Sequence, residues 1–356
     1  MRLLIAGGGT GGHVFPAIAV AQEWLRRGQE REVVLVGTER GMEAKLVPQA
    51  GLPLETIRAA GLKGIGGLRL LRNVAMLAPS LWDSAAILRR HRFAAAFGTG
   101  GYVTGMVMFT AAVRGVPGVI FEPNAQPGLA NRWLAPLTRR IATAHESTAQ
   151  FWGRKAAVTG CPVRLEFFDA PAREPRSPYR LLITGGSQGA LPVNRAVVDA
   201  LDQLAQRKSE LSVVHQTGER DYNAVRVAYA RREFNAEVVP FIQNMAERFA
   251  QADLIVCRAG AITVAEVAAA GRAAIFVPFG RATDSHQLRN AQVMEAAGAG
   301  RLIAEPELTG ERLAREIFFL LDQPSQLQQM AQHARTLARP RAVEDIVNLI
   351  EEVARP

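Results

Sequence analysis

The chain has little of what a secreted or membrane-spanning protein needs. It holds two cysteines among 356 residues, Cys161 and Cys257, which excludes a disulfide framework and suits a reducing cytoplasm. The longest run without a charged residue, 93–113, is broken by glycines into strand, loop and helix signals, so we exclude a membrane span. The first apolar run covers only residues 3–6 before a block of glycines, so we expect no signal peptide.

Lysine is scarce, and arginine supplies nearly all of the net charge of +9. Excess positive charge fits nucleic acid, an anionic membrane or a phosphorylated substrate as partner. Aromatic residues make up only 6% of the chain, and no basic run is interleaved with them as single-strand binding requires. We therefore expect no nucleic-acid partner.

Motifs for metals and common cofactors are also missing. The histidines have no metal-ligand spacing, no P-loop motif occurs, and no Asp-x-Asp element is present. The second predicted strand ends at Val36 without the acidic residue that NAD binding requires. We expect no metal and no cofactor.

Two glycine turns organise the chain. Residues 3–6 predict a buried strand, and five of the next six residues, 7–12, are glycine. Pro16 is expected in the first turn of the helix that follows. The sequence Leu-Leu-Ile before a glycine pair recurs at 181–186, which predicts two similar domains. Either turn suits dinucleotide enzymes, sugar-nucleotide enzymes or a structural role.

Strand and helix signals alternate throughout, which predicts an α/β protein with doubly wound parallel sheets. A proline-rich segment between 162 and 178 predicts the hinge between the domains. We expect a first domain at 1–163 and a second at 164–340. An apolar stripe predicts a closing helix at 341–356, which is a candidate for packing back on the first domain.

Polar groups follow several predicted strands, where open α/β sheets bind ligands. His13, Tyr102 and Glu122 follow three strands of the first half and are expected around one crevice. His13 is a candidate general base because a histidine pKa lies near working pH, and a structural role remains the alternative. Glu122 is the other candidate, since Pro123 holds its backbone extended.

In the second half, Thr263 and Glu266 have the spacing of a helix capping box. The alternative is a ligand site, in which free N–H groups bind a diphosphate and Glu266 accepts the hydroxyls of a ribose. Arg164 and Ser187 are candidate donors to the phosphates. The segment 61–72 mixes glycine, bulky apolar residues and cations, which fits either a solvated loop or a contact with anionic lipid.

Four motifs carry a resemblance that runs essentially end to end. They are Gly8-Gly9-Thr10-Gly11-Gly12-His13-Val14-Phe15-Pro16, Gly100-Gly101-Tyr102-Val103-Thr104-Gly105, Gly185-Gly186-Ser187-Gln188-Gly189-Ala190 and Cys257-Arg258-Ala259-Gly260-Ala261-Ile262-Thr263-Val264-Ala265-Glu266. Together with Val277-Pro278-Phe279 and 287–291, they resemble the MurG family, the UDP-N-acetylglucosamine–N-acetylmuramyl-(pentapeptide) pyrophosphoryl-undecaprenol N-acetylglucosamine transferases of bacterial cell-wall synthesis.

The resemblance implies a GT-B fold, in which two Rossmann-like domains face each other across a cleft. It implies an inverting transfer of N-acetylglucosamine from its UDP sugar to the C4 hydroxyl of the muramyl residue of lipid I, giving lipid II. It further implies a peripheral enzyme on the cytoplasmic face of the cell membrane, with an anionic membrane surface and other cell-wall enzymes as candidate partners. The loop at 61–72 then becomes a candidate membrane contact.

The resemblance also implies roles for particular residues. His13 or Glu122 is the expected base, and Gly100, Gly101 and Tyr102 are expected near the acceptor diphosphate. The donor is expected on Arg164, Ser187, Ile242, Ala261, Ile262, Thr263, Val264, Ala265, Glu266 and Gln287. Thr10, Gly11, Gly12 and Asn124 are expected to reach it from the first domain.

Two departures from the family pattern stand out. The family usually has His-Glu-Gln-Asn where this chain has Phe121-Glu122-Pro123-Asn124, and it usually has serine at Thr104. Three other functions remain as alternatives. The first is another UDP-sugar enzyme of the same fold, such as an epimerase or glycolipid transferase, and the second is a non-catalytic scaffold that binds nucleotide sugar and membrane. The third is a dinucleotide oxidoreductase, which the missing acidic residue after Val36 disfavours.

Overall fold

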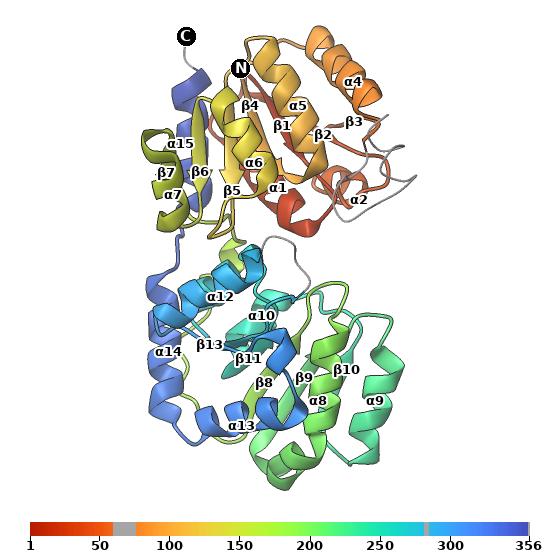
Figure 1. Ribbon diagram of the computed structural model, residues 1–356, viewed down its shortest axis with the longest axis vertical. Coiled ribbons are helices and arrows are strands. Elements are labelled where there is room, and N and C mark those ends of the chain that lie inside the picture. The colour runs from red at the N-terminus through yellow and green to blue at the C-terminus, as the bar shows by residue number, and fades with distance from the viewer. Residues whose placement is uncertain (60–75, 281–284, 355–356) are drawn as a thin grey trace. The chain divides into compact units, whose positions relative to one another are not determined.

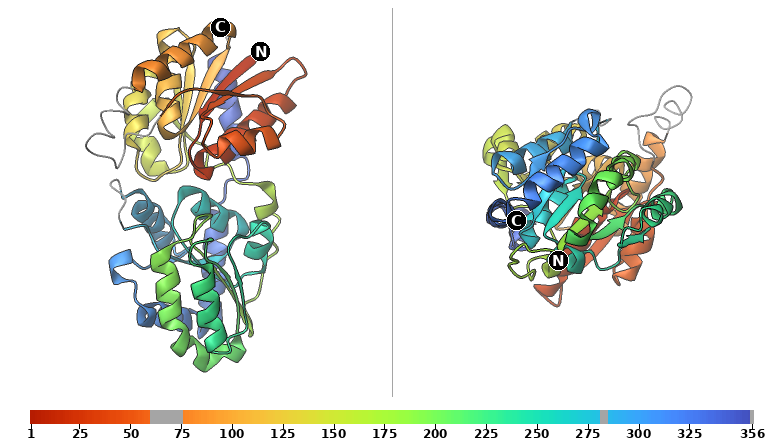
Figure 2. Two further views of the ribbon diagram at one scale, coloured as in Figure 1. Left: turned by 90° about the vertical axis from the view of Figure 1, so that its right-hand side faces the viewer. Right: turned by 90° about the horizontal axis from the view of Figure 1, so that it is seen from below.

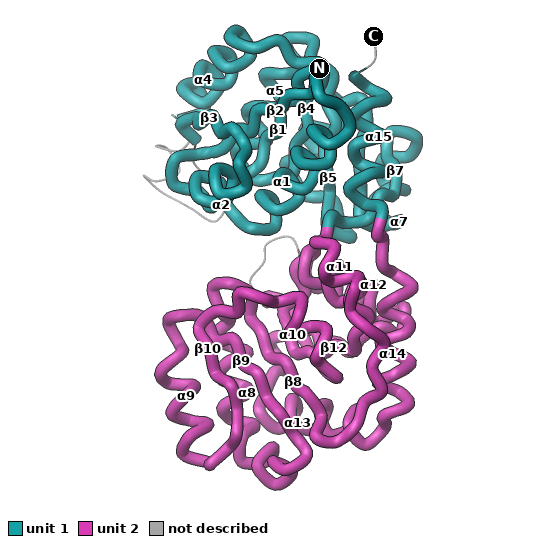
Figure 3. The backbone as a smooth tube through the Cα atoms, turned by 180° about the vertical axis from the view of Figure 1, so that it is seen from behind, with its two compact units in different colours: residues 1–162, 341–356 teal, residues 163–340 magenta. Residues whose placement is uncertain are grey.

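The computed structural model describes residues 1–59, 76–280 and 285–354 (Figure 1). The chain divides into two compact units, unit 1 with residues 1–162 and 341–356, and unit 2 with residues 163–340 (Figure 3). The predicted membrane-contact loop at 61–72 lies outside the described residues. In the described part of the chain, no helix is both long and apolar enough to cross a membrane.

Unit 1 is built on a parallel sheet of buried apolar strands. Across the described residues the sheet has seven strands, in the spatial order β3 (Leu54–Thr56), β2 (Glu32–Gly37), β1 (Arg2–Gly7), β4 (Ala95–Gly100), β5 (Gly118–Glu122), β6 (Arg140–Thr143) and β7 (Ala156–Val158). The order reverses between β1 and β4, so the carboxyl ends of these two strands flank the position where open α/β sheets bind ligands.

Helices cover both faces of this sheet (Figures 1 and 2). They are α1 (Gly11–Arg26), α2 (Glu43–Gln49), α4 (Leu77–Arg90), α5 (Gly101–Val113), α6 (Leu129–Leu134), α7 (Glu146–Trp152) and α15 (Ala342–Ala354). Leu4, Ala6 and Ile120 point to one face and pack there with residues of α4, α5 and α6. The closing helix α15 packs on α1 and on strands β4, β5 and β6. The last helix therefore completes the core of the first unit.

Unit 2 repeats the architecture with a shorter sheet. Its strands lie in the order β10 (Ala236–Val239), β9 (Leu211–Gln216), β8 (Tyr179–Thr184), β11 (Leu254–Cys257), β12 (Ala273–Phe276) and β13 (Arg301–Leu302). All pairs are parallel, and the order reverses between β8 and β11. The predicted α/β class with two parallel, doubly wound sheets is confirmed.

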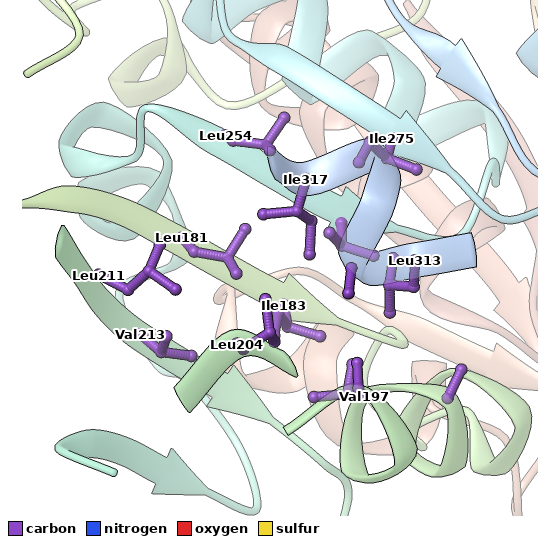
Figure 4. Close-up of a cluster of buried hydrophobic side chains, with 14 of the residues drawn as sticks. Leu181, Ile183, Val197, Leu204, Leu211, Val213, Leu254, Ile275, Leu313 and Ile317 are labelled. Atoms are coloured by element: carbon purple, nitrogen blue, oxygen red, sulfur yellow. The ribbon is translucent and has the colours of Figure 1, made fainter. Parts of the chain in front are cut away.

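The core of unit 2 follows from alternation along the strands. Leu181 and Ile183 of β8 point to one face and pack against α8 (Leu191–Leu204) and α13 (Gly310–Leu321), as Figure 4 shows. Leu182 points to the other face, toward α10 (Met245–Gln251), α11 (Ala261–Ala270), α12 (His286–Ala296) and α14 (Pro324–Thr336). The remaining helix, α9 (Tyr222–Arg231), packs beside α8 and β10. Each fully buried leucine or isoleucine contributes about 1.5–3 kcal/mol of transfer free energy.

Candidate functional site

The glycine turn after β1 leads directly into α1. Gly9 has a φ of +89°, and Thr10 is the extended N-cap residue, without a side-chain capping bond. The helix begins at Gly11, so Pro16 lies inside the helix rather than in its first turn, and that prediction was wrong. The helix starts within the glycines because Thr10, with extended backbone, is the N-cap, and Pro16 leaves the Gly12 carbonyl without its usual intrahelical donor.

His13 lies beside the turn between β4 and α5. A Cβ atom placed on Gly100 would lie 3.0 Å from His13 Nε2, and one placed on Gly101 would lie 2.7 Å from the Gly8 carbonyl. Both glycines have positive φ, +111° and +83°, so side chains are disfavoured there by space and by backbone. Thr99 Oγ1 also donates to the His13 carbonyl over 2.8 Å. The structure therefore brings His13 and the 100–101 turn together.

The imidazole of His13 is mostly enclosed, and its Nδ1 atom is buried without a hydrogen-bond partner. Burial lowers the pKa of His13 to about 4, against an opposing field from Glu43. The expectation of a pKa near working pH was therefore wrong, because burial disfavours the imidazolium. At neutral pH the ring is uncharged and free to accept a proton, although it is a weak base.

Glu122 is almost completely buried at the end of β5, with 1% of its surface exposed. Its Oε1 accepts from the backbone and side-chain nitrogens of Asn124, both over 3.0 Å. Its Oε2 accepts from Gly128 N over 2.8 Å and from Asn131 Nδ2 over 2.9 Å. The carboxylate thus fastens the loop after β5 to the start of α6. Phe121, where the family usually has histidine, is fully buried in the strand.

In unit 2, the turn after β8 carries the exposed Ser187. A Cβ atom on Gly189, whose φ is +73°, would overlap the Thr217 carbonyl, so backbone segments touch there. The buried Gln216 ties the turn to the next loop, because its Nε2 donates to the Gly186 carbonyl over 2.8 Å and its Oε1 accepts from Ile242 N over 3.2 Å. Sequence reasoning missed Gln216, which reads as the last residue of a strand.

The turn after β11 leads into α11, whose N-cap is Gly260. Thr263 is the third residue of this helix, so the capping box predicted for Thr263 and Glu266 was wrong. Gly260 takes the N-cap position in an extended conformation, three residues before Thr263, so the hydroxyl of Thr263 lies inside the helix and not at its cap. Its first N–H groups lie at the switch point between β8 and β11.

Glu266 is half-buried in α11. Burial raises its pKa to about 7, and the positive charge of Arg164 opposes the rise. Arg164 is exposed, just before the short helix at Leu165–Phe167, and its guanidinium lies 5.1 Å from the Phe167 ring. A carboxyl group near its pKa at neutral pH is sensitive to any ligand that donates hydrogen bonds to it.

Gln287 lies in the first turn of α12, and its Oε1 accepts from Phe279 N over 2.9 Å. The neighbouring loop is held by Arg258, which is 8% exposed and donates to the carbonyls of Val277 and Pro278, each over 3.1 Å. Arg258 also pairs with Glu305 over 2.6 Å. The sequence motif contained Arg258, but this role depends on contacts far along the chain.

The predicted residues therefore form one set in each unit. In unit 1, residues 10–13 and 100–102 meet at the switch point, and Glu122 and Asn124 follow β5, the strand beyond β4. In unit 2, Ser187 follows β8 and residues 261–266 follow the adjacent strand β11. Gln216 joins Ile242 to the turn after β8 that carries Ser187. In the described part of the chain, no group of three or more His, Cys, Asp or Glu side chains is arranged to hold a metal ion.

Family models match both halves of the chain. Residues 3–143 match the glycosyltransferase family 28 N-terminal domain, and residues 180–346 match the glycosyltransferase family 28 C-terminal domain.

Full-length relatives carry one name. A UDP-N-acetylglucosamine–N-acetylmuramyl-(pentapeptide) pyrophosphoryl-undecaprenol N-acetylglucosamine transferase from Myxococcus xanthus is 42% identical, over 98% of this chain and 92% of the relative. A protein of the same name from an Anaeromyxobacter species is 44% identical, over 100% of this chain and 94% of the relative.

Solved structures agree with the sequence matches. MurG from Acinetobacter baumannii superposes with a TM-score of 0.81 at 33% identity, over 99% of both chains. A UDP-GlcNAc 2-epimerase from Neisseria meningitidis, solved with UDP-GlcNAc bound, superposes with a TM-score of 0.72 at 14% identity, over 99% of this chain and 100% of the epimerase. The second match shows a shared fold alone.

Proposed function

Because this chain belongs to glycosyltransferase family 28, and within it to the MurG family, we propose that it transfers N-acetylglucosamine from UDP-N-acetylglucosamine to the muramyl residue of lipid I, giving lipid II. The observation that carries this function is the identity of 42–44% with so-named transferases over nearly the whole chain. The protein is thus a UDP-sugar-dependent hexosyltransferase of peptidoglycan synthesis with the GT-B fold.

The reaction is proposed to invert the anomeric centre in one displacement. The C4 hydroxyl oxygen of the acceptor attacks the anomeric carbon, while the bond from that carbon to the β-phosphate oxygen breaks. The electron pair leaves on UDP, and the hydroxyl proton passes to a base. His13 supports this role, because its ring is neutral and Nδ1 has no partner. Proton transfer to so weak a base becomes favourable only as the new C–O bond forms and acidifies the hydroxyl.

Glu122 is proposed to position the loop after β5 rather than to take the proton. Its carboxylate accepts four hydrogen bonds, from Asn124, Gly128 and Asn131, and its side chain is buried. A carboxylate that already accepts four hydrogen bonds has little capacity left for a substrate hydroxyl. Tyr102, which is 37% exposed and follows Gly100 and Gly101, is proposed to line the acceptor diphosphate.

Unit 2 is proposed to bind the donor. The free N–H groups at the start of α11 and the Arg164 guanidinium can stabilise the charge that develops on the diphosphate as UDP leaves. Glu266 is proposed to accept hydrogen bonds from the ribose hydroxyls. The proposed donor site on this unit comprises Arg164, Ser187, Ile242, Ala261, Ile262, Thr263, Val264, Ala265, Glu266 and Gln287. Thr10, Gly11, Gly12 and Asn124 are proposed to contribute from unit 1.

A peripheral location on the cytoplasmic face of the membrane is proposed, because the acceptor's lipid tail stays in the bilayer. Support comes from large apolar side chains exposed on three helices, of which α4 packs on α5 and α5 packs on α6. They are Trp82, Phe109, Val113, Leu129 and Trp133. Arg89 lies 5.4 Å from the Trp82 ring, and such pairing of cations with interfacial tryptophans suits an anionic lipid surface. Other cell-wall enzymes are further proposed partners.

The deciding experiment is transfer of labelled N-acetylglucosamine from its UDP sugar to a short-chain lipid I analogue, with EDTA present. Labelled disaccharide lipid is the expected product. If product forms only after magnesium is restored, the reaction stands and metal independence fails. If no product forms in either condition, the acceptor is wrong. Conversion of UDP-N-acetylglucosamine without an acceptor would then favour an epimerase of the same fold.

A further inference from the structure

Glu43, the first residue of α2, joins two turns of unit 1 through one buried carboxylate. Its Oε2 accepts from Gly9 N over 2.8 Å, and its Oε1 accepts from both the backbone nitrogen and the hydroxyl of Thr38 over 2.9 Å. The side chain has no exposed surface. The turn after β1 and the turn after β2 are therefore held by the same group.

Three glycines make room for this carboxylate. A Cβ atom added at Gly8, Gly37 or Gly41 would collide with atoms of the Glu43 side chain. Part of the glycine content at the front of the chain thus serves an internal carboxylate. The bond from Gly9 N also removes that N–H from the groups available to a ligand phosphate, which distinguishes this turn from a diphosphate-binding glycine loop.

His13 lies within reach of the same charge. It follows Gly9 by four residues, on the first turn of α1, and its ring lies against Gly100 and Gly101. The negative charge of Glu43 acts to raise the pKa of this ring, against the larger effect of burial. Fixing Gly9 fixes the entry into α1, and therefore where the His13 ring lies relative to the 100–101 turn.

We propose that Glu43 is a positioning residue of the transfer reaction, which holds the glycine turn so that His13 meets the acceptor hydroxyl in the productive geometry. The inference rests on the proposed function, with His13 as the base. If Glu43 acted only on stability, its substitution would lower the resistance of the fold to urea but would not change kcat relative to KM or alter the His13 ring. If Glu43 positions His13, its substitution lowers kcat more than it changes KM, and it also alters the pKa of the His13 ring.

The test compares Glu43→Gln and Thr38→Val with the matched control Glu39→Gln, a substitution of an exposed glutamate on the same turn. Glutamine keeps one acceptor oxygen, but its NH2 group must face either Gly9 N or Thr38 N. In both cases a donor faces a donor, and one hydrogen bond is lost. We expect Glu43→Gln to lower kcat by about tenfold or more, the effect of one misplaced buried hydrogen bond. The KM for UDP-N-acetylglucosamine should change less than kcat, because ten of the fourteen residues of the proposed donor site lie on unit 2. Thr38→Val should cause a smaller loss in the same direction, and Glu39→Gln none.

A second arm needs no substrate. In protein labelled with 13C-histidine, the His13 ring signal is identified by its loss in His13→Asn and is then titrated by NMR. Removing the negative charge at Glu43 should lower the His13 pKa further, since that charge favours the imidazolium. The same titration in Glu39→Gln should match wild type.

An unchanged kcat or an unchanged His13 titration in Glu43→Gln overturns the proposal. If Glu43→Gln does not fold, a wild-type kcat in Thr38→Val overturns it instead. If the wild-type protein transfers no sugar at all, the proposed function fails, and the titration still decides whether Glu43 acts on His13.

Discussion

Asn131 donates its side-chain amide to the Glu122 carboxylate over 2.9 Å, so the buried face of α6 is fastened to the carboxyl end of β5. The same oxygen accepts from Gly128 N, at the N-cap of α6. The two groups that open α6 therefore both depend on Glu122. Glu122 is therefore part of the framework of this loop. This distinguishes it from His13, the other candidate for the base, whose Nδ1 has no hydrogen-bond partner.

Replacing Glu122 by glutamine should damage stability as well as turnover. Glutamine keeps one acceptor oxygen, but an NH2 group replaces the other. The N–H donors that bonded to the lost oxygen then face a second donor. Leaving such buried donors unsatisfied should lower the free energy of unfolding by about 2–4 kcal/mol, measured by urea denaturation. Asn131→Ala, which removes one donor, should cost about 1–2 kcal/mol. A Glu122→Gln variant of wild-type stability with no turnover would instead identify Glu122 as the base.

The plot of kcat against pH should show no fall in kcat with a midpoint near pH 6.5, the ordinary pKa of histidine. Burial lowers the pKa of His13 to about 4, so the ring is already neutral well below pH 6.5. With both substrates saturating, kcat should stay flat between about pH 5.5 and 7.5 with respect to this group. His13→Asn should lower kcat by about 10²–10⁴-fold with little change in urea stability. A kcat limb with a midpoint near 6.5 in the wild-type enzyme would contradict the pKa and the assignment together.

The fold was predictable because its signals are local. Apolar runs such as 3–6 and 181–184 end in glycines, and helical patterns lie between them, so the parallel sheets follow from the sequence. The helix starts were less accessible. Capping rules expect a polar N-cap side chain, whereas the N-cap of α11 is Gly260 and α1 begins after Thr10 without a capping bond. The turn before α1 is held by a tertiary contact, the bond from Gly9 N to Glu43, which no local rule predicts.

The sites were predictable only as far as their motifs are continuous in the chain. The glycine turn at 100–101 and the segment 261–266 are recognisable in the sequence by residue type and spacing. Glu43 and Gln216 are not, because Glu43 reaches Gly9, 34 residues away, and Gln216 reaches Gly186 and Ile242, 30 and 26 residues away. The lowered pKa of His13 was also out of reach, since it depends on how much of the ring the fold encloses.

Donor binding should strengthen as pH rises through neutrality. Burial raises the pKa of Glu266 to about 7, against the field of Arg164, so the carboxylate that is proposed to accept ribose hydroxyls forms fully only above that pH. The Kd for UDP, measured by calorimetric titration, should therefore fall between about pH 6 and 8. Glu266→Gln should bind more weakly and lose this dependence, whereas Glu247→Gln, a change of an exposed glutamate on α10, should keep it. A dependence that survives in Glu266→Gln would assign the titration to another group.

The closing helix should depend on Glu351 in a pH-dependent way. Glu351 on α15 accepts from Arg31 over 2.7 Å and pairs with Arg27 over 3.1 Å, which joins α15 to the end of α1 and to the loop after it. Burial works to raise the pKa of Glu351, but the two arginines outweigh it and hold the pKa below its ordinary value. A carboxyl group with a lowered pKa in the folded state contributes stability above its unfolded pKa and loses it as pH falls through the folded one. Glu351→Gln should thus lower the free energy of unfolding by about 1 kcal/mol at pH 7, and the difference from wild type should shrink below about pH 4.

The control for this prediction is Glu352→Gln on the same helix. Glu352 pairs with Arg140, but its side chain is 54% exposed, against 20% for Glu351. Solvent screens the exposed pair, so its loss should change stability by only a few tenths of a kcal/mol at any pH. Equal effects of the two substitutions would mean that the contact of α15 with α1 is held by its apolar residues alone. In that case Ile346 and Ile350, both fully buried, would be the side chains whose truncation releases the helix.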